Sequence, residues 1–168
     1  MNLIVGVGNR YRRDEGVGPA VIDRLESSGR NGPETSIVDA GLAGVGLLDV
    51  ARGARRMVVV DAVRSGARPG TVIVLGPEAL LGREPRPNLS LHAADLIGVI
   101  DLARALDHPL PEIRIVGIEA ADLGWGEGLS PEVDAALDEA VEAALAAAVG
   151  GAVGPNGVRT GDGRNRDE

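Results

Sequence analysis

Short apolar runs alternate with segments of helical periodicity through most of this chain. The clearest run ends at Asp61 and is rich in Val, as expected of a strand buried on both faces of a sheet. We predict five strands, at residues 2–7, 35–39, 56–61, 71–75 and 112–118. Helical patterns begin at Val17, Leu42, Ser90 and Ser130. This alternation predicts an α/β fold, a three-layer α/β/α sandwich around a mostly parallel five-stranded sheet.

One of the five strands is expected to depart from the parallel arrangement. Residues 71–75 follow the preceding strand after a connection that is too short for a helical crossover, so we expect this strand to run antiparallel to its neighbour. Two further segments are predicted loops. Residues 82–89 contain Pro85 and Pro87, and residues 120–129 are rich in Gly.

The 168 residues are enough for one domain with a substantial core. The chain has no Phe, one Trp and one Tyr, so that core must be aliphatic. We assign residues 1–150 to the domain. Residues 151–168 are rich in Gly, Asn, Arg and Asp and have little to bury, which predicts a disordered tail.

Composition also narrows the functional classes. A net charge of −8 argues against a nucleic-acid partner, which would need a basic face. Without Cys, the chain has no thiolate nucleophile and no Cys-based zinc site. Neither a charged leader nor a long apolar stretch is visible, so we expect no signal peptide and no membrane span. We predict a cytoplasmic protein and a monomer.

Three chemically active residues lie where predicted strands end or helices begin. Glu15 follows the first strand, Asp61 ends the third, and His92 falls in the first turn of the helix that begins at Ser90. Ligands of open α/β sheets bind outside the carboxyl ends of the strands, so we expect the three side chains to converge there. Two carboxylates and one imidazole suit a borderline divalent metal and leave coordination positions open. The helix dipole favours the neutral form of His92, which is the form that binds a metal.

Each of these residues also has a simpler interpretation. Glu15 and its neighbour Asp14 suit the start of a helix, where carboxylates are favoured. Asp61 is compatible with an Asx-turn, and the same turn chemistry accounts for Asp39. His92 is compatible with an ordinary surface position on its helix. The sequence alone leaves these interpretations open.

The segment Gly6-Val7-Gly8 is similar to the start of a dinucleotide-binding fingerprint. Tyr11 stands where the third Gly belongs, which argues against a helix packed closely beneath a pyrophosphate. Arg12 and Arg13 are nevertheless suited to a phosphate. A nucleotide-binding module therefore stays open as an alternative.

Five segments in chain order together resemble a known family. They are Gly6-Val7-Gly8-Asn9 followed by Asp14-Glu15-Gly16-Val17-Gly18, Asp39 and Gly41 with Leu47-Leu48, Val60-Asp61-Ala62, Ser90-Leu91-His92, and Gly117-Ile118-Glu119 followed by Gly128-Leu129-Ser130. With these motifs the chain resembles the hydrogenase maturation proteases from about Asn2 to Val149. Ala120 departs from the proline often found there in the family, which affects only the local loop shape.

The resemblance implies an α/β/α fold and an endopeptidase that removes a C-terminal extension from the large-subunit precursor of a nickel–iron hydrogenase, after nickel has been inserted. It implies that Glu15, Asp61 and His92 bind the nickel, which the substrate supplies, and no organic cofactor is expected. We assign Glu15 and Asp61 to catalysis. Asp39 joins them as a group that orients a ligand or acts as a base.

Three further residues are predicted to bind the substrate. They are Asn9 and Asp14 in the loop after the first strand, and Trp125 in the Gly-rich loop. The alternative from another functional class is a non-catalytic, nickel-dependent checkpoint or chaperone that binds the precursor and cuts nothing. Both functions use the same three metal ligands, so the sequence does not separate them.

Overall fold

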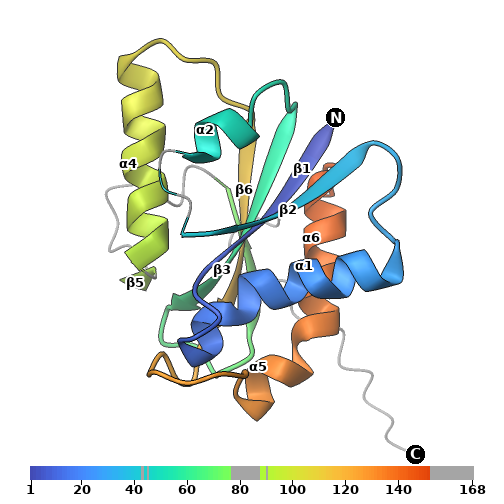
Figure 1. The fold of residues 1–168 in the computed structure, drawn as a ribbon, viewed down its shortest axis with the longest axis vertical. Helices are drawn as coiled ribbons and strands as arrows, with labels where there is room; N and C mark the ends of the chain where they lie inside the picture. The colour runs from blue at the N-terminus through green and yellow to red at the C-terminus, as the bar shows by residue number, and fades with distance from the viewer. Residues whose placement is uncertain (43, 45, 77–87, 90, 152–168) are drawn as a thin grey trace, which may run out of the picture.

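The computed structural model describes residues 1–42, 44, 46–76, 88, 89 and 91–151, and at 88, 89 and 91–95 it describes the backbone (Figure 1). The strands of the described part are β1 (Asn2–Val7), β2 (Thr35–Gly41), β3 (Arg56–Arg64), β4 (Val72–Leu75), β5 (Asn88–Leu89) and β6 (Glu112–Glu119). The helices are the 3-10 helix η1 (Arg13–Gly16), α1 (Val17–Ser28), α2 (Gly46–Val50), α4 (Leu91–Ala105), α5 (Pro131–Ala135) and α6 (Leu137–Ala148).

One mixed sheet organises the molecule, with the strand order β2-β1-β3-β6-β4. β1 pairs in parallel with β2 and β3, and β3 pairs in parallel with β6. β4 runs antiparallel to β6 at the edge of this path. The predicted five-stranded, mostly parallel sheet with one antiparallel strand is therefore confirmed. The two-residue strand β5 adds to it by pairing antiparallel with β3.

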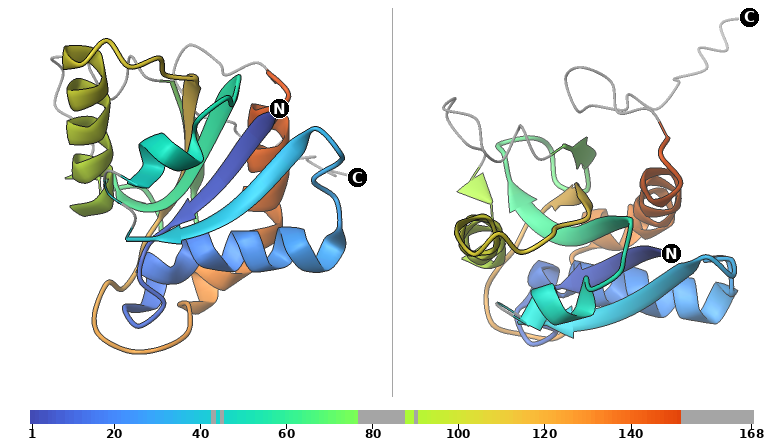
Figure 2. Two further views of the ribbon diagram at one scale, coloured as in Figure 1. Left: turned by 45° about the horizontal axis from the view of Figure 1, so that its top comes forward. Right: turned by 90° about the horizontal axis from the view of Figure 1, so that it is seen from above.

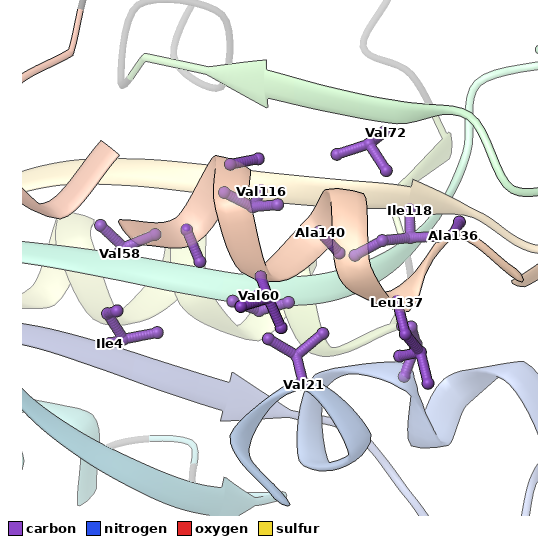
Figure 3. Close-up of a cluster of buried hydrophobic side chains, with 14 of the residues drawn as sticks. Ile4, Val21, Val58, Val60, Val72, Val116, Ile118, Ala136, Leu137 and Ala140 are labelled. Atoms are coloured by element: carbon purple, nitrogen blue, oxygen red, sulfur yellow. The ribbon is translucent and has the colours of Figure 1, made fainter. Parts of the chain in front are cut away.

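Alternate residues of the parallel strands face two separate cores, because side chains of a strand alternate between the faces of a sheet. Ile4, Val58 and Val60 pack against α1 and α6 in the core shown in Figure 3. Leu3 and Val59 belong to the second core, on the face covered by α2 and α4. The sheet lies between these two helix layers (Figures 1 and 2). The predicted three-layer sandwich and its aliphatic core are confirmed.

The predicted end of the third strand at Asp61 is wrong, because β3 continues to Arg64. The extra residues find partners on both sides: Val63 pairs with β6 on one side and with Leu89 of β5 on the other. The loop predicted over residues 82–89 therefore ends in a short strand. Neither feature is visible in the sequence, because both depend on which segments meet in the folded chain.

The single helix predicted from Ser130 is two helices in the structure. α5 and α6 are separated at Ala136. Val133 of α5 and Leu137 of α6 both lie in the core beneath α1, so the apolar spacing continues across the break and hides it from a periodicity argument. The helix predicted over residues 42–51 is also shorter, because α2 spans only part of it.

Glycine lets the first turn of α1 pack directly on strand backbones at the carboxyl edge of the sheet. A Cβ atom on Gly18 would overlap the carbonyl oxygens of Val7 and Val60, and one on Gly6 would overlap the carbonyl of Gly18. Gly8 has a φ of 134°, which favours glycine, at the tight exit from β1. η1 and the start of α1 are thereby held over the ends of β1 and β3.

Some predictions fall on parts of the chain that the structure does not describe. The tail at residues 152–168 and the helix cap at Ser90 lie outside the described residues, so the disordered tail, the cap and the domain boundary at residue 150 stay predictions. Within the described part, no helix is long and apolar enough to cross a membrane.

Candidate functional site

Two loops meet at the carboxyl edge of the sheet: residues 8–16, which follow β1 and include η1, and residues 120–130, which follow β6. Backbone hydrogen bonds join them. The amide of Gly126 donates to the Tyr11 carbonyl (2.9 Å), and the amide of Arg13 donates to the Gly126 carbonyl (2.8 Å). The left view of Figure 2 shows the two loops side by side. The loop that holds the first predicted metal ligand is thus braced by the loop that holds the only Trp.

The buried side chain of Asp14 holds these two loops together. It is fully buried (0% exposed), and its carboxylate accepts hydrogen bonds from the amides of Ala121, Asp122 and Ser130 at 2.8, 2.9 and 2.7 Å. The Ser130 hydroxyl donates a fourth bond at 2.9 Å. A buried carboxylate is tolerated when hydrogen bonds of this kind replace its hydration. The structure gives Asp14 a structural role, and the predicted substrate contact by Asp14 stays a prediction.

Glu15 is the next residue, and it is also buried (4% exposed). Its Oε1 forms an ion pair with Nη1 of Arg12, at a distance of 3.1 Å. The other amino group of Arg12 donates to the carbonyl of Leu123 at 2.8 Å, and the guanidinium lies over the ring of Trp125, 5.4 Å from its centroid. Arg12 therefore connects the predicted ligand Glu15 to Leu123 and Trp125 of the neighbouring loop.

Asp61 is almost fully buried (1% exposed). It lies one position past the last residue of β3 that pairs with β1, so it is at the carboxyl edge of β1 although β3 continues. Strand alternation places it on the same face as Val59, which is the face covered by α4. Its Oδ1 accepts a hydrogen bond from the Ala62 amide at 2.8 Å. The alternative of an Asx-turn is wrong, because the chain runs on as a strand to Arg64.

The backbone of His92 lies in the first turn of α4, as predicted. The pairing of Val63 and Arg64 with β5 brings the chain into α4 beside β3, just beyond Asp61. His92 and Asp61 are therefore on the same face of the sheet and at the same edge. The His92 side chain is outside the described part of the structure, so convergence of the three ligands stays a prediction. Among the described side chains, no three His, Cys, Asp or Glu residues form a metal site.

Asp39 lies on β2, opposite Gly6 of β1. Its Oδ2 accepts a hydrogen bond from Nη2 of Arg10 at 2.7 Å, and Arg10 also binds Asp23 of α1 through two bonds of 2.6 and 2.9 Å. The bonds to Asp23 and Asp39 raise the pKa of Arg10, and the guanidinium lowers the pKa of Asp23. Arg10 thus links β2 to α1. A catalytic role for Asp39 stays a prediction.

Asn9 and Trp125 are the other two predicted substrate contacts. Oδ1 of Asn9 accepts a hydrogen bond from the Tyr11 amide at 2.9 Å, so this side chain shapes the loop as an Asx-turn. Trp125 and Tyr11 are 76% and 65% exposed, and they are the only Trp and Tyr of the chain. Exposed aromatic residues of this size are typical of contact surfaces. A substrate contact by Trp125 stays a prediction.

Two residues that order the site were not predicted. The sequence offered a phosphate contact for Arg12, which in the structure holds Glu15. Glu119 at the end of β6 is buried, and its carboxylate accepts hydrogen bonds from the amide (2.8 Å) and hydroxyl (2.6 Å) of Ser65, closing the turn after β3. The two partners of this second contact are far apart in sequence. Only the family motif that ends at Glu119 marks the position.

This chain is similar to known proteins over most of its length. The family model described as hydrogenase maturation protease matches residues 19–147. The hydrogenase 2 maturation protease of Escherichia coli K12 is 30% identical over 137 residues, which are 81% of this chain and 83% of that protein. The hydrogenase expression/formation protein HoxM of Cupriavidus necator is 29% identical over 139 residues, 82% of this chain and 69% of that protein.

Solved structures show the same similarity. The nickel–iron hydrogenase maturation protease HybD of Thermococcus kodakarensis matches with a TM-score of 0.75 and 29% identity, over 88% of this chain and 99% of that one. The hydrogenase maturating endopeptidase HybD of E. coli matches with a TM-score of 0.74 and 28% identity, over 88% of this chain and 91% of that one. The motifs, the fold and these relatives agree, and the chain belongs to the hydrogenase maturation protease family, a family of endopeptidases.

Proposed function

We propose that this protein removes the C-terminal extension of a nickel-loaded hydrogenase large-subunit precursor and recognises the precursor by its nickel. The observation that carries the proposal is the burial of two carboxylates, Glu15 and Asp61, at the edge of the sheet where α4 begins. Ligands of α/β sheets bind at this edge. A divalent cation brought to the site would meet both acidic groups.

The donor set fits nickel that remains in its substrate. Two carboxylates together with the imidazole of His92 form an oxygen and nitrogen site with positions left for ligands from the precursor. Affinity alone would let such a site take copper or zinc, so selectivity for nickel comes from the precursor's own coordination sphere. The nickel supplies Lewis acidity at the scissile carbonyl or the attacking water. Glu15, Asp61 and His92 fix the precursor's C-terminal segment beside it.

Other residues of the chain prepare the substrate for cleavage. Trp125 offers an exposed aromatic surface beside Glu15, to which the precursor binds. Asp39 is held by Arg10 in the structure, so its role as a base or a ligand-orienting group requires that this ion pair open when the substrate binds. The active unit in this proposal is a monomer.

Intact mass measurement of the precursor tests the proposal. A nickel-loaded precursor incubated with the wild-type protein should lose the mass of a short C-terminal peptide. Asp61→Asn removes one buried ligand charge and should slow this loss by about a hundredfold or more, within the range for groups that stabilise the transition state. Asp138→Asn is the matched control, because Asp138 lies on α6 with 82% of its side chain exposed. It should cut at the wild-type rate.

Two outcomes contradict the proposal. A wild-type protein that binds the nickel-loaded precursor but leaves its mass unchanged would be a checkpoint or chaperone. If Asp61→Asn cut the precursor at the rate of Asp138→Asn, the buried carboxylate of Asp61 would have no part in cleavage. If both variants melt at the wild-type temperature, any loss of activity is not caused by unfolding.

A further inference from the structure

The guanidinium of Arg12 makes three contacts that belong to different parts of the site. Nη1 pairs with Oε1 of Glu15 at 3.1 Å, Nη2 donates to the Leu123 carbonyl at 2.8 Å, and the guanidinium lies 5.4 Å from the centre of the Trp125 ring. A guanidinium is planar and presents its donors in a fixed fork. A displacement of the indole or of its loop therefore moves the donor that holds the Glu15 carboxylate.

Burial makes this link effective. The side chains of Arg12 and Glu15 are 30% and 6% exposed, so their attraction is screened less by water than that of a surface pair. Nε of Arg12 is buried and has no hydrogen-bond partner among the described residues. An unsatisfied buried donor costs free energy, so the other three contacts must be what keeps Arg12 in this position.

The other end of this set of contacts is an exposed aromatic side chain, Trp125. The two cores are aliphatic, whereas Trp125 is 76% exposed and Tyr11, on the paired loop, is 65% exposed. Aromatic residues of this kind commonly anchor a protein partner. The inner end of the link is Glu15, a predicted ligand of the substrate's nickel.

We propose that Arg12 is a positioning residue that couples Trp125 to Glu15. Contact of the precursor with the indole of Trp125 fixes the guanidinium, and the guanidinium holds the Glu15 carboxylate in the orientation that meets the nickel. Docking and metal recognition are then linked events. The inference rests on the proposed function for the identity of the docked partner, while the physical link between the three residues exists in the free protein.

Fluorescence of the free protein tests the link without a substrate. Trp125 is the only Trp, so all tryptophan emission reports on it. Arg12→Met uncovers one face of the ring and should raise the acrylamide quenching constant roughly twofold. Glu15→Gln keeps the arginine but removes the carboxylate charge that holds its guanidinium over the ring. It should therefore also raise the quenching constant. Combining the two changes should add little, because both release the same contact.

Arg13→Met is the matched control. It removes an equal charge from the same loop, and Arg13 pairs with Asp122 at 3.4 Å instead of with Glu15. Its quenching constant should equal that of the wild type. Quenching in Glu15→Gln that equals the wild-type value, while Arg12→Met differs, would overturn the coupling.

Cleavage kinetics test the consequence for the reaction. Trp125→Ala should raise KM and also lower kcat by about fivefold, because the indole acts both on docking and, through Arg12, on Glu15. In an Arg12→Met background the same change should still raise KM but leave kcat within about twofold. Arg12→Lys keeps the charge without the planar fork, and should resemble Arg12→Met in this cycle.

The proposal would be overturned if Trp125→Ala and Arg12→Met lowered kcat independently, so that their effects multiply in the double variant. It would also be overturned if Arg12→Lys behaved as the wild type in this cycle. Failure of the proposed function looks different. A wild-type protein that leaves the nickel-loaded precursor uncut contradicts the proposed protease, whereas the quenching measurement on the free protein still decides whether Arg12 couples the two residues.

Discussion

Adjacent carboxylates in the loop after β1 perform different tasks. Asp14 has its oxygens bonded to three amides and one hydroxyl of the loop after β6, whereas Glu15 forms an ion pair with Arg12. Both residues are buried to nearly the same extent. The two residues differ in the partners described for them: Asp14 is bonded to fixed backbone amides, and Glu15 is paired with a side-chain cation.

Replacing Asp14 by Ala should therefore destabilise the whole molecule. The change leaves several buried amide donors without an acceptor, which we expect to lower the free energy of unfolding by about 3 kcal/mol. Urea denaturation measures this loss. Asp138→Ala, at an exposed position of α6, should change stability by less than about 0.5 kcal/mol. A loss at Asp14 no larger than at Asp138 would show that these hydrogen bonds do not anchor the loops.

Individual residues were predictable from the sequence where a motif marks them. Glu15 and Asp61 follow apolar runs, and both lie at the carboxyl edge, as expected from parallel strands. The roles of Arg12 and Asp14 were not predictable. Each depends on partners more than a hundred residues away in the chain, as for Asp14 and Ser130, and no local pattern encodes such a pairing.

At the scale of elements, the position of the site depends on how closely α1 approaches the sheet. Gly18 in the first turn of α1 touches the backbones of β1 and β3, so there is no room for a side chain. This contact sets the height of η1, and with it Glu15, above the strand ends. The start of the strands is held differently, by Glu112, which pairs with Arg56 at 2.6 Å and Arg114 at 2.7 Å.

A pair of glycine substitutions separates close packing from helix propensity. Gly18→Ala should destabilise by about 2 kcal/mol or more, because the new methyl group overlaps two strand carbonyls. Gly98→Ala on α4 meets nothing within 4 Å, and should stabilise by about 0.5–1 kcal/mol through helix propensity. Thermal unfolding compares the two. Equal shifts of the melting temperature in both variants would contradict the close approach of α1.

The pairs around Glu112 predict a dependence of stability on pH. Hydrogen bonds first from Arg56 and then from Arg114 lower the pKa of Glu112 below its ordinary value of about 4.3. A depressed pKa contributes stability that is present above the unfolded-state value and is lost as the pH falls through the folded-state value. Because Glu112 is partly exposed, the contribution is at most about 1 kcal/mol.

Glu112→Gln should therefore be less stable than the wild type at pH 7, with a difference that shrinks below about pH 4. Urea denaturation at both pH values measures it. Glu127→Gln in the Gly-rich loop serves as a carboxylate control and should show no such trend. A Glu112→Gln deficit that is the same at pH 7 and at pH 3 would contradict the ionic origin of the effect.

Most elements were predictable from apolar runs and helical spacing, because local pattern and burial agree along the chain. The strands, their parallel or antiparallel directions and the two helix layers follow from that agreement. The extension of β3 past Asp61, the strand β5 and the break at Ala136 do not follow. The first two arise from pairing between segments that are distant in sequence, and the break at Ala136 is hidden because apolar spacing continues across it.

The whole molecule divides into a rigid aliphatic body and one chemically active edge. Among the described residues, the two cores on either side of the sheet are aliphatic apart from Met57, and the buried acids Asp14, Glu15 and Asp61 lie at the carboxyl edge. This edge also contributes to stability, because the buried Asp14 carboxylate holds its two loops together. This arrangement agrees with an enzyme that receives its metal with its substrate and holds a large protein partner at one end.

Glu15, Asp61 and His92 are proposed to recognise nickel inside the precursor, and a comparison of two forms of that precursor tests this role. Nickel-loaded and metal-free forms of the same precursor are incubated with the wild-type protein, and the rate of loss of the C-terminal peptide is followed by intact mass. We predict rapid processing of the loaded form and none of the metal-free form, even when free nickel is added with the protein alone. Equal processing of the metal-free precursor would contradict the account and indicate a peptidase that does not depend on the substrate's metal.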